Sequence, residues 1–284
     1  MKLNRLFALS LAAVMLCTGC SNDAKPAGKP VDAAAAYDTL TAELAKWDGS
    51  QNVSTLVSGN IFTEYNKLPS AVAFTGQYMQ QAASAGNEIF AAMNFDYGDG
   101  YYYATNFLSN GTEFATSVES GSTDPASTDE PIYIGEYVDA ETFRSGVSFG
   151  LPVLAFDEGL VTSAATEEDK EHGYTLVTFQ LDADRCENAV ITLLEHLQYI
   201  DTDVVPVTAD VSSMSCTADY DGETLVNLTY KFSADLTAEG EVMKMDYFFT
   251  HSLNKNGEDV KFGLPNLENI VTDNTATEDL TVIE

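Results

Sequence analysis

The chain has 284 residues, 45% of them hydrophobic, and is long enough to bury a sizeable core. Its 44 acidic residues against 13 basic ones give a formal net charge of −31. A surface this acidic repels phosphate backbones, which excludes nucleic acid as a partner and argues against adsorption to anionic headgroups by charge alone.

The first twenty residues have the layout of an export signal. Lys2 and Arg5 precede a short apolar run, residues 6–16, which leads into Cys17-Thr18-Gly19-Cys20. The apolar run is too short and wrongly flanked for a membrane-spanning helix. Its end resembles the bacterial lipobox, and this resemblance implies that residues 1–19 are removed and that Cys20 becomes lipidated. Cys17 stands where that motif usually has Leu, so ordinary secretory cleavage is the alternative. Lipidation would fix the protein to the extracytoplasmic face of the cell membrane.

A tether and one helix follow. Residues 20–31 contain Pro, Lys and small residues, which predicts a flexible tether after the lipidated Cys20. Asp32 then predicts the cap of a helix over residues 33–47, in which apolar residues recur at helical spacing and the only Trp is a core anchor.

From residue 53 onward the pattern predicts strands. Apolar and polar residues alternate up to residue 118, interrupted by Gly-containing turns, as in an antiparallel meander. Residues 119–131 predict an exposed loop and 132–138 a short strand. Residues 139–160 are apolar but broken by Gly and Pro. They are either one or two short helices laid across the open face of the sheet, or a mobile flap over a cavity.

Next come an acidic loop, a strand and a helix. We expect the loop at residues 162–172 and the strand at 174–181. Asp184 predicts the cap of a helix that ends near Tyr199 and turns Cys186 inward. Cys216 lies on the buried side of the following strand, so both thiols face the core. A disulfide and two buried free thiols explain this pattern equally well.

Residues 211–261 predict three more antiparallel strands with strict alternation. One face of these strands is rich in soft and aromatic side chains, which suit an irregular apolar ligand. We expect this hydrophobic ligand face to comprise Met214, Tyr230, Phe232, Met243, Met245, Tyr247 and Phe249. Residues 260–264 predict an edge strand, and residues 266–284 an acidic C-terminal tail.

The sequence contains no catalytic or metal-binding motif. His172, His196 and His251 lie in unrelated contexts without metal-ligand spacing, and no serine has the context of a nucleophile. We therefore expect no enzyme activity, no metal and no cofactor.

The order of these elements resembles the LolA-like superfamily, which includes the LppX-type and LprG-type lipid-binding lipoproteins. The closing strands carry the resemblance, in particular residues 219–222 (DYDG) and 256–262 (NGEDVKF). It implies an α+β fold for a single domain over residues 32–265. That fold is a curved, incompletely closed antiparallel β-sheet, a half-barrel with helices packed on its concave side.

The resemblance also implies a function. It predicts a monomeric, membrane-anchored extracytoplasmic lipoprotein that binds or carries a lipid or another hydrophobic ligand in the concavity. The alternative is that the helices fill the concavity. The protein would then be a surface-interaction or envelope-structural lipoprotein without a ligand, and it would bind a protein or wall partner through its acidic outer face and the loop at residues 119–131.

Overall fold

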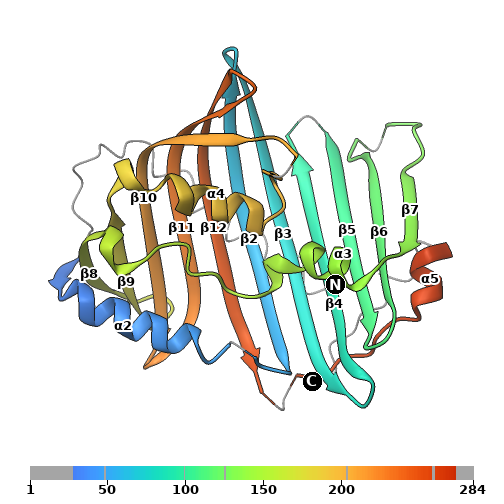
Figure 1. Cartoon of the computed structure of the whole chain (residues 1–284), viewed down its shortest axis with the longest axis horizontal. Coiled ribbons are helices and arrows are strands. Elements are labelled where there is room, and N and C mark those ends of the chain that lie inside the picture. Colours follow the sequence, from blue (N-terminus) through green and yellow to red (C-terminus); the bar gives the residue numbers. More distant parts are fainter. Residues whose placement is uncertain are drawn as a thin grey trace.

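The computed structural model describes residues 28–47, 49–98, 100–124, 126–202, 204–257 and 260–272. The expected signal peptide, Cys20 and most of the tether lie outside the described residues, as do residues 273–284 of the expected tail. Strands make up most of the secondary structure of the described residues (Figure 1).

The strands join into a single sheet. They are β1 (Lys29–Val31), β2 (Val53–Tyr65), β3 (Leu68–Ala83), β4 (Gly86–Tyr97), β5 (Tyr101–Asn110), β6 (Phe114–Ser122), β7 (Ile132–Tyr137), β8 (Val161–Asp169), β9 (Tyr174–Leu181), β10 (Val207–Asp221), β11 (Thr224–Ala238) and β12 (Glu241–Asn256). All pairs are antiparallel, in the order β1-β8-β9-β10-β11-β12-β2-β3-β4-β5-β6-β7. The predicted meanders are therefore confirmed, and the sheet is open, with β1 and β7 at its edges.

Two predictions at the β1 edge are wrong. The expected acidic loop at 162–172 is mostly strand β8, because Ala164 and Ala165 are buried while its carboxylates point to water near the sheet edge. The tether is also shorter than expected, since Lys29 pairs with Thr166 and the end of the tether forms β1.

The helices are α2 (Ala33–Leu44), α3 (Ala140–Gly146), α4 (Glu187–His196) and α5 (Leu267–Thr272). The Asp32 cap is confirmed, because its carboxylate accepts hydrogen bonds from the backbone N–H groups of Ala34 and Ala35. The Asp184 cap is wrong: this residue lies in a short 3₁₀ turn, and α4 begins at Glu187. Cys186, which we expected to face inward, is nevertheless buried.

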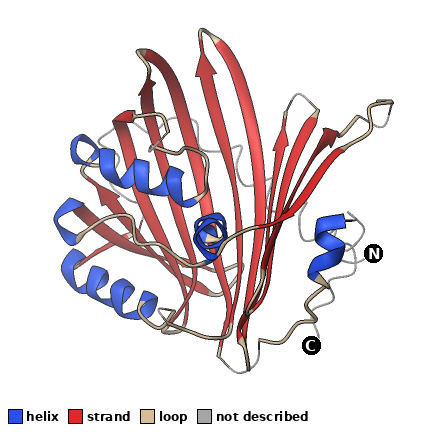
Figure 2. Ribbon diagram, turned by 45° about the vertical axis from the view of Figure 1, so that its right-hand side comes forward, coloured by secondary structure: helices blue, strands red, loops and turns tan. Residues whose placement is uncertain are grey.

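The C-terminal end departs from the sequence pattern. Residues 260–264 form no edge strand; only Phe262 bridges to the sheet, and its N–H donates to Oε1 of Gln81. Helix α5 follows inside the expected tail. It buries Leu267 and Ile270 against β5–β7, in a small second core. Its residues cover the face opposite to the one that α2, α3 and α4 cover (Figure 2).

Residues 139–160 form a strap across the sheet, which is the first of the two predicted alternatives (Figure 1). Side chains of the sheet and of α2 hold its irregular backbone. Thr55 Oγ1 donates to the Gly150 carbonyl at 2.6 Å, and the Tyr230 hydroxyl donates to the Val153 carbonyl at 2.8 Å. The Tyr37 hydroxyl donates to the Phe156 carbonyl at 3.2 Å. Three carbonyls of the strap thus have side-chain hydrogen-bond partners where it packs on the sheet and on α2.

Close packing of the strap requires glycine at residue 150. A Cβ at this position would lie 2.1 Å from the ring of Tyr78. We expect Gly150→Ala to lower the free energy of unfolding by about 1–3 kcal/mol, because overpacking forces the strap off the sheet. Urea denaturation measures this. Gly263→Ala is the control, since a Cβ there meets nothing within 4 Å; equal effects of the two variants would contradict the prediction.

Candidate functional site

The predicted ligand face lies in the interior of the protein. Met214, Tyr230, Phe232, Met245, Tyr247 and Phe249 are buried, and Met243 is half-buried at the margin of the same core. Helix α4 and the strap pack over these side chains. Helix α4 and the strap therefore cover the expected hydrophobic ligand face, and ligand binding at these residues stays a prediction.

An aromatic row leads out of this core across the sheet. Tyr230 stacks with Phe249 at 6.4 Å between ring centroids, and Phe249 stacks with Phe74 at 6.2 Å. The row continues from Phe74 to Phe95 at 6.1 Å and from Phe95 to Tyr103 at 6.3 Å. It thus connects the covered strands β11 and β12 with the half of the sheet beyond β3.

Strands β4–β7 present an apolar surface that the helices leave open. It lies on the same face as the strap, as the cross-strand pairs show. We call this surface the aromatic face and define it by Phe95, Tyr97, Tyr101, Tyr103, Val118, Ile132 and Ile134. Tyr101 is 56% exposed, Ile132 64% and Ile134 59%. Exposed apolar side chains that adjoin one another in this way mark a binding surface more often than scattered ones do.

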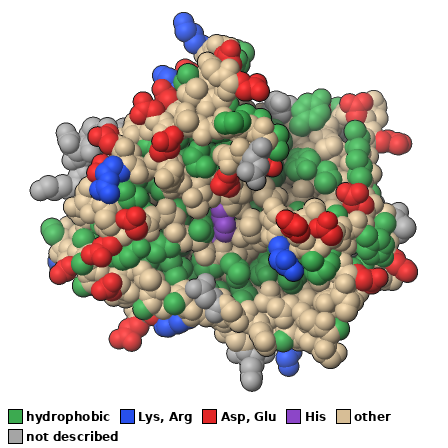
Figure 3. Space-filling model, viewed as in Figure 1, with side chains coloured by type: hydrophobic (Ala, Val, Ile, Leu, Met, Phe, Trp, Pro, Cys, Tyr) green, Lys and Arg blue, Asp and Glu red, His purple; other side chains and the backbone are tan. Residues whose placement is uncertain are grey.

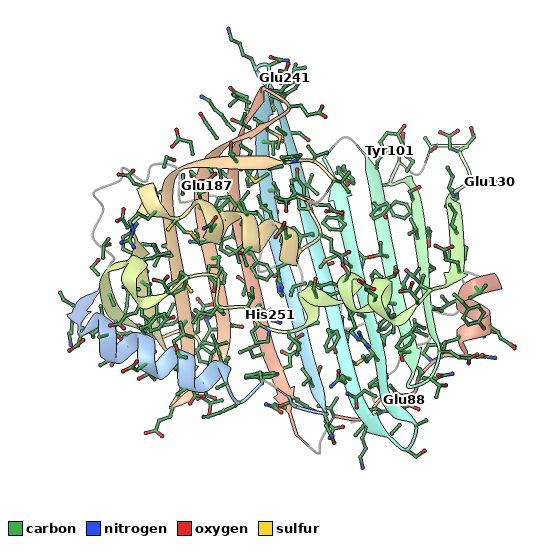
Figure 4. All side chains as sticks on the ribbon, in the orientation of Figure 1. Glu88, Tyr101, Glu130, Glu187, Glu241 and His251 are labelled. Atoms are coloured by element: carbon green, nitrogen blue, oxygen red, sulfur yellow. The ribbon has the colours of Figure 1, made fainter. Side chains whose placement is uncertain are left out.

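The space-filling view shows the same arrangement. Hydrophobic side chains gather on the right of this face, over β5–β7, and carboxylates lie around them (Figure 3). Tyr101 and Glu130 lie at the same end of the sheet (Figure 4). The surface therefore combines an apolar centre with an acidic rim.

A pocket of about 380 Å³ lies beside α3 on the same side of the sheet, at the other end of β4 and β5 from Tyr97 and Tyr101. Its lining includes Ile89 and Phe114 from the sheet, and Phe143 and Val147 from the strap. Arg144 also lines it and, among the described residues, forms no ion pair. Phe143 packs on Phe114 at 5.0 Å between ring centroids, which fixes the wall of the pocket. A second pocket, of about 450 Å³, lies over β2 and β10–β12 and is lined largely by polar and acidic side chains.

Two histidines lie beneath the strap. The rings of His196 and His251 are 6.5 Å apart, and Ser148 Oγ donates to the carbonyl of His196. Both nitrogens of His251 and Nε2 of His196 are buried, and none has a hydrogen-bond partner of good geometry among the residues described. Burial lowers the pKa of His196 to about 4, and burial together with His196 lowers that of His251 to about 3. Both rings are therefore neutral at pH 7.

Both predicted inward-facing thiols are buried, and the structure leaves them free. Cys186 precedes α4 and Cys216 lies on β10. Burial raises the pKa of Cys186 to about 11 and raises that of Cys216 further. Thiolate is scarce at neutral pH in both cases, so neither is a reactive nucleophile.

Within the described part of the chain, no group of three or more His, Cys, Asp or Glu side chains could hold a metal ion. None of the described helices is long and apolar enough to span a membrane.

Comparisons with known proteins identify no relative by sequence: no family model and no curated protein matches the chain. Among solved structures, a DUF1329 family protein from Desulfovibrio piger is 11% identical, with 83% of this chain and 95% of that chain covered and a TM-score of 0.23. A putative AttH from Nitrosomonas europaea is 9% identical, with 74% and 54% covered and a TM-score of 0.18. Likenesses at such TM-scores carry no argument about fold or function.

The residues of the aromatic face lie in alternating segments of the sequence, and this alternation predicts only the strands that carry them. Phe95 and Tyr97 end one alternating segment, and Tyr101 and Tyr103 begin the next. Alternation shows which residues share a face, but it does not show whether a helix covers that face.

The buried histidines predict acid sensitivity. An unfolded chain takes up a proton on His251 near pH 6.5, whereas the folded protein does so only near pH 3. The free energy of unfolding is therefore highest above pH 6.5 and falls as the pH drops below that value. Protonation of His251 in the unfolded chain lowers it by about 2 kcal/mol at pH 5. We expect His251→Leu to reduce this pH dependence in urea denaturation at pH 5 and 7.5. The exposed His172 provides the control: if His172→Gln had the same effect, the prediction would fail.

The burial of both thiols predicts how the folded and the denatured protein react with a thiol reagent. In protein expressed without residues 1–20, only Cys186 and Cys216 remain. We expect Ellman's reagent to find no reactive thiol in the folded state, because both are buried, and two after denaturation without reductant. Finding none after denaturation would reveal a disulfide instead.

Proposed function

We propose that this protein is a membrane-anchored extracytoplasmic lipoprotein that binds a lipid or another apolar small molecule and catalyses no reaction. The anchor is Cys20, supported by the export signal and the lipobox-like residues that precede it. The ligand site is the aromatic face on β4–β7, rather than the covered strands β10–β12.

One observation carries the proposal: Tyr101, Ile132 and Ile134 expose more than half of their surface on one face of the sheet. Water in contact with so many apolar side chains is unfavourable by about 25 cal/mol for each Å². A ligand that covers this face releases that water.

The arrangement also supports a LolA-like fold. In this proposal the sheet is a curved half-barrel whose concave side carries α2, α4 and the strap. These elements fill the concavity over β8–β12, β2 and β3, and α3 crosses to β6. The part of β4–β7 at the Tyr97 and Tyr101 end is left for a ligand. This division reconciles the two sequence-based alternatives, a filled core and a ligand cavity, because each applies to one half of the sheet.

A charge on the aromatic face tests the site. The neutral dye N-phenyl-1-naphthylamine reports apolar sites by its fluorescence. We expect saturable binding of one dye molecule, and Ile134→Glu should weaken it about tenfold or more, equal to about 1.4 kcal/mol, because the ligand would have to desolvate the carboxylate.

Val242→Glu is the matched control. Val242 is also an exposed aliphatic residue on a strand, 51% accessible, but it lies outside the aromatic face. Circular dichroism confirms that both variants fold. If Ile134→Glu left dye binding unchanged, or if Val242→Glu weakened it equally, the aromatic face would not be the site.

A further inference from the structure

We infer that the ligand of the aromatic face is a cationic amphiphile, an apolar chain that carries an alkylammonium group. This inference rests on the proposed function, because it names the chemistry of a ligand at that same site. Two independent observations support it, the distribution of charge along the chain and the arrangement of the rings.

The first observation is the absence of basic residues from this half of the sheet. Between Leu68 and Phe143 the sequence contains eleven Asp and Glu and no Lys, Arg or His. This segment supplies β3–β7 and the start of α3. Glu88, Asp96 and Glu119 lie on the opposite face of the sheet, whereas Glu136 shares the face of Ile134, and Glu130 lies at the same end of the sheet as Tyr101 (Figure 4). With no cation on these strands, the carboxylates on this side and at this end set up a negative potential over the aromatic face. Such a potential concentrates cations and repels anions.

Arg144 is the first base that follows, and it lines the α3 pocket. An anionic ligand on the aromatic face would therefore find no cation on β4–β7 themselves. It would also have to displace its own hydration in the field of the carboxylates. Charge complementarity thus favours a cation.

The second observation is a group of four rings on two neighbouring strands. Phe95 on β4 pairs across the sheet with Tyr103 on β5, and Tyr97 pairs with Tyr101. The rings of Phe95 and Tyr103 are 6.3 Å apart and tilted by 46°. Tyr97 is 37% exposed and Tyr101 56%, so ring surface remains accessible to a ligand.

Aromatic rings attract ammonium groups through the negative potential of their faces, and groups of rings hold quaternary ammonium ions in this way. Val118, Ile132 and Ile134 lie beside the rings on β6 and β7. They offer apolar surface for an alkyl chain. The rings thus fit the head of a cationic amphiphile and the aliphatic side chains fit its tail.

Four probes separate the contributions to binding. Octyltrimethylammonium, 1-octanol and octanoate share one chain and differ in charge, and tetramethylammonium is the head without the chain. Isothermal titration calorimetry on the protein from Ser21 onward, below the micellar concentration, measures each. We expect one site for octyltrimethylammonium, at least about tenfold tighter than 1-octanol, with weaker binding of tetramethylammonium and none of octanoate.

Two variants separate ring attraction from general charge. Tyr101→Leu and Tyr103→Leu keep apolar surface but remove the ring. Each should weaken octyltrimethylammonium binding about fivefold and leave 1-octanol binding almost unchanged. Tyr65→Leu is the control, because Tyr65 is also exposed, at 41%, but lies at the end of β2.

The outcomes distinguish the two proposals. Equal affinity for octyltrimethylammonium and 1-octanol would overturn the cationic ligand but leave an apolar site in place. Many weak sites for octyltrimethylammonium that the two tyrosine variants do not change would also overturn it. Binding of tetramethylammonium as tight as that of octyltrimethylammonium would exclude an amphiphile. If none of the octyl probes bound, the proposed function itself would fail.

Discussion

The Tyr230 hydroxyl holds the strap by using both of its hydrogen-bonding capacities. It donates to the Val153 carbonyl and accepts from the Ala155 N–H. An irregular segment buried on a sheet would otherwise leave peptide groups without partners, each of which costs about 1–3 kcal/mol. Thr55 and Tyr37 satisfy further carbonyls of the strap in the same way. The cover over the central strands depends on these side chains, and α3 reaches β6 only because the strap carries it there.

The division of the sheet follows from how far this cover extends. Helix α4 and the strap bury most of the face of β10–β12, and the aromatic row passes from under them to Phe95 and Tyr103. The same kind of residue therefore has two roles along one row. Under the strap, rings stabilise the fold by packing; beyond it, their surface remains available to a ligand.

Sequence periodicity predicted the strands well, because alternation is a local property of each segment. Tyr230, Tyr247 and Phe249 were correctly placed on one face, but their role depended on what packs over them. Strand β8 was missed because its acidic residues, such as Glu167 and Glu168, mimic a loop. Helix α5 was missed because its six residues show too little periodicity. The pair His196 and His251 could not be foreseen, since one lies on a helix and the other on a distant strand.

The lack of basic residues between Leu68 and Phe143 also decides how this half of the protein reacts chemically. Trypsin cuts only after Lys and Arg, so β3–β7 and most of α3 leave the protein as a single peptide that ends at Arg144. Amine-directed labels and cross-linkers find no lysine anywhere on these strands. Contacts made there with another molecule are invisible to lysine chemistry and accessible through the carboxylates, which carbodiimides activate.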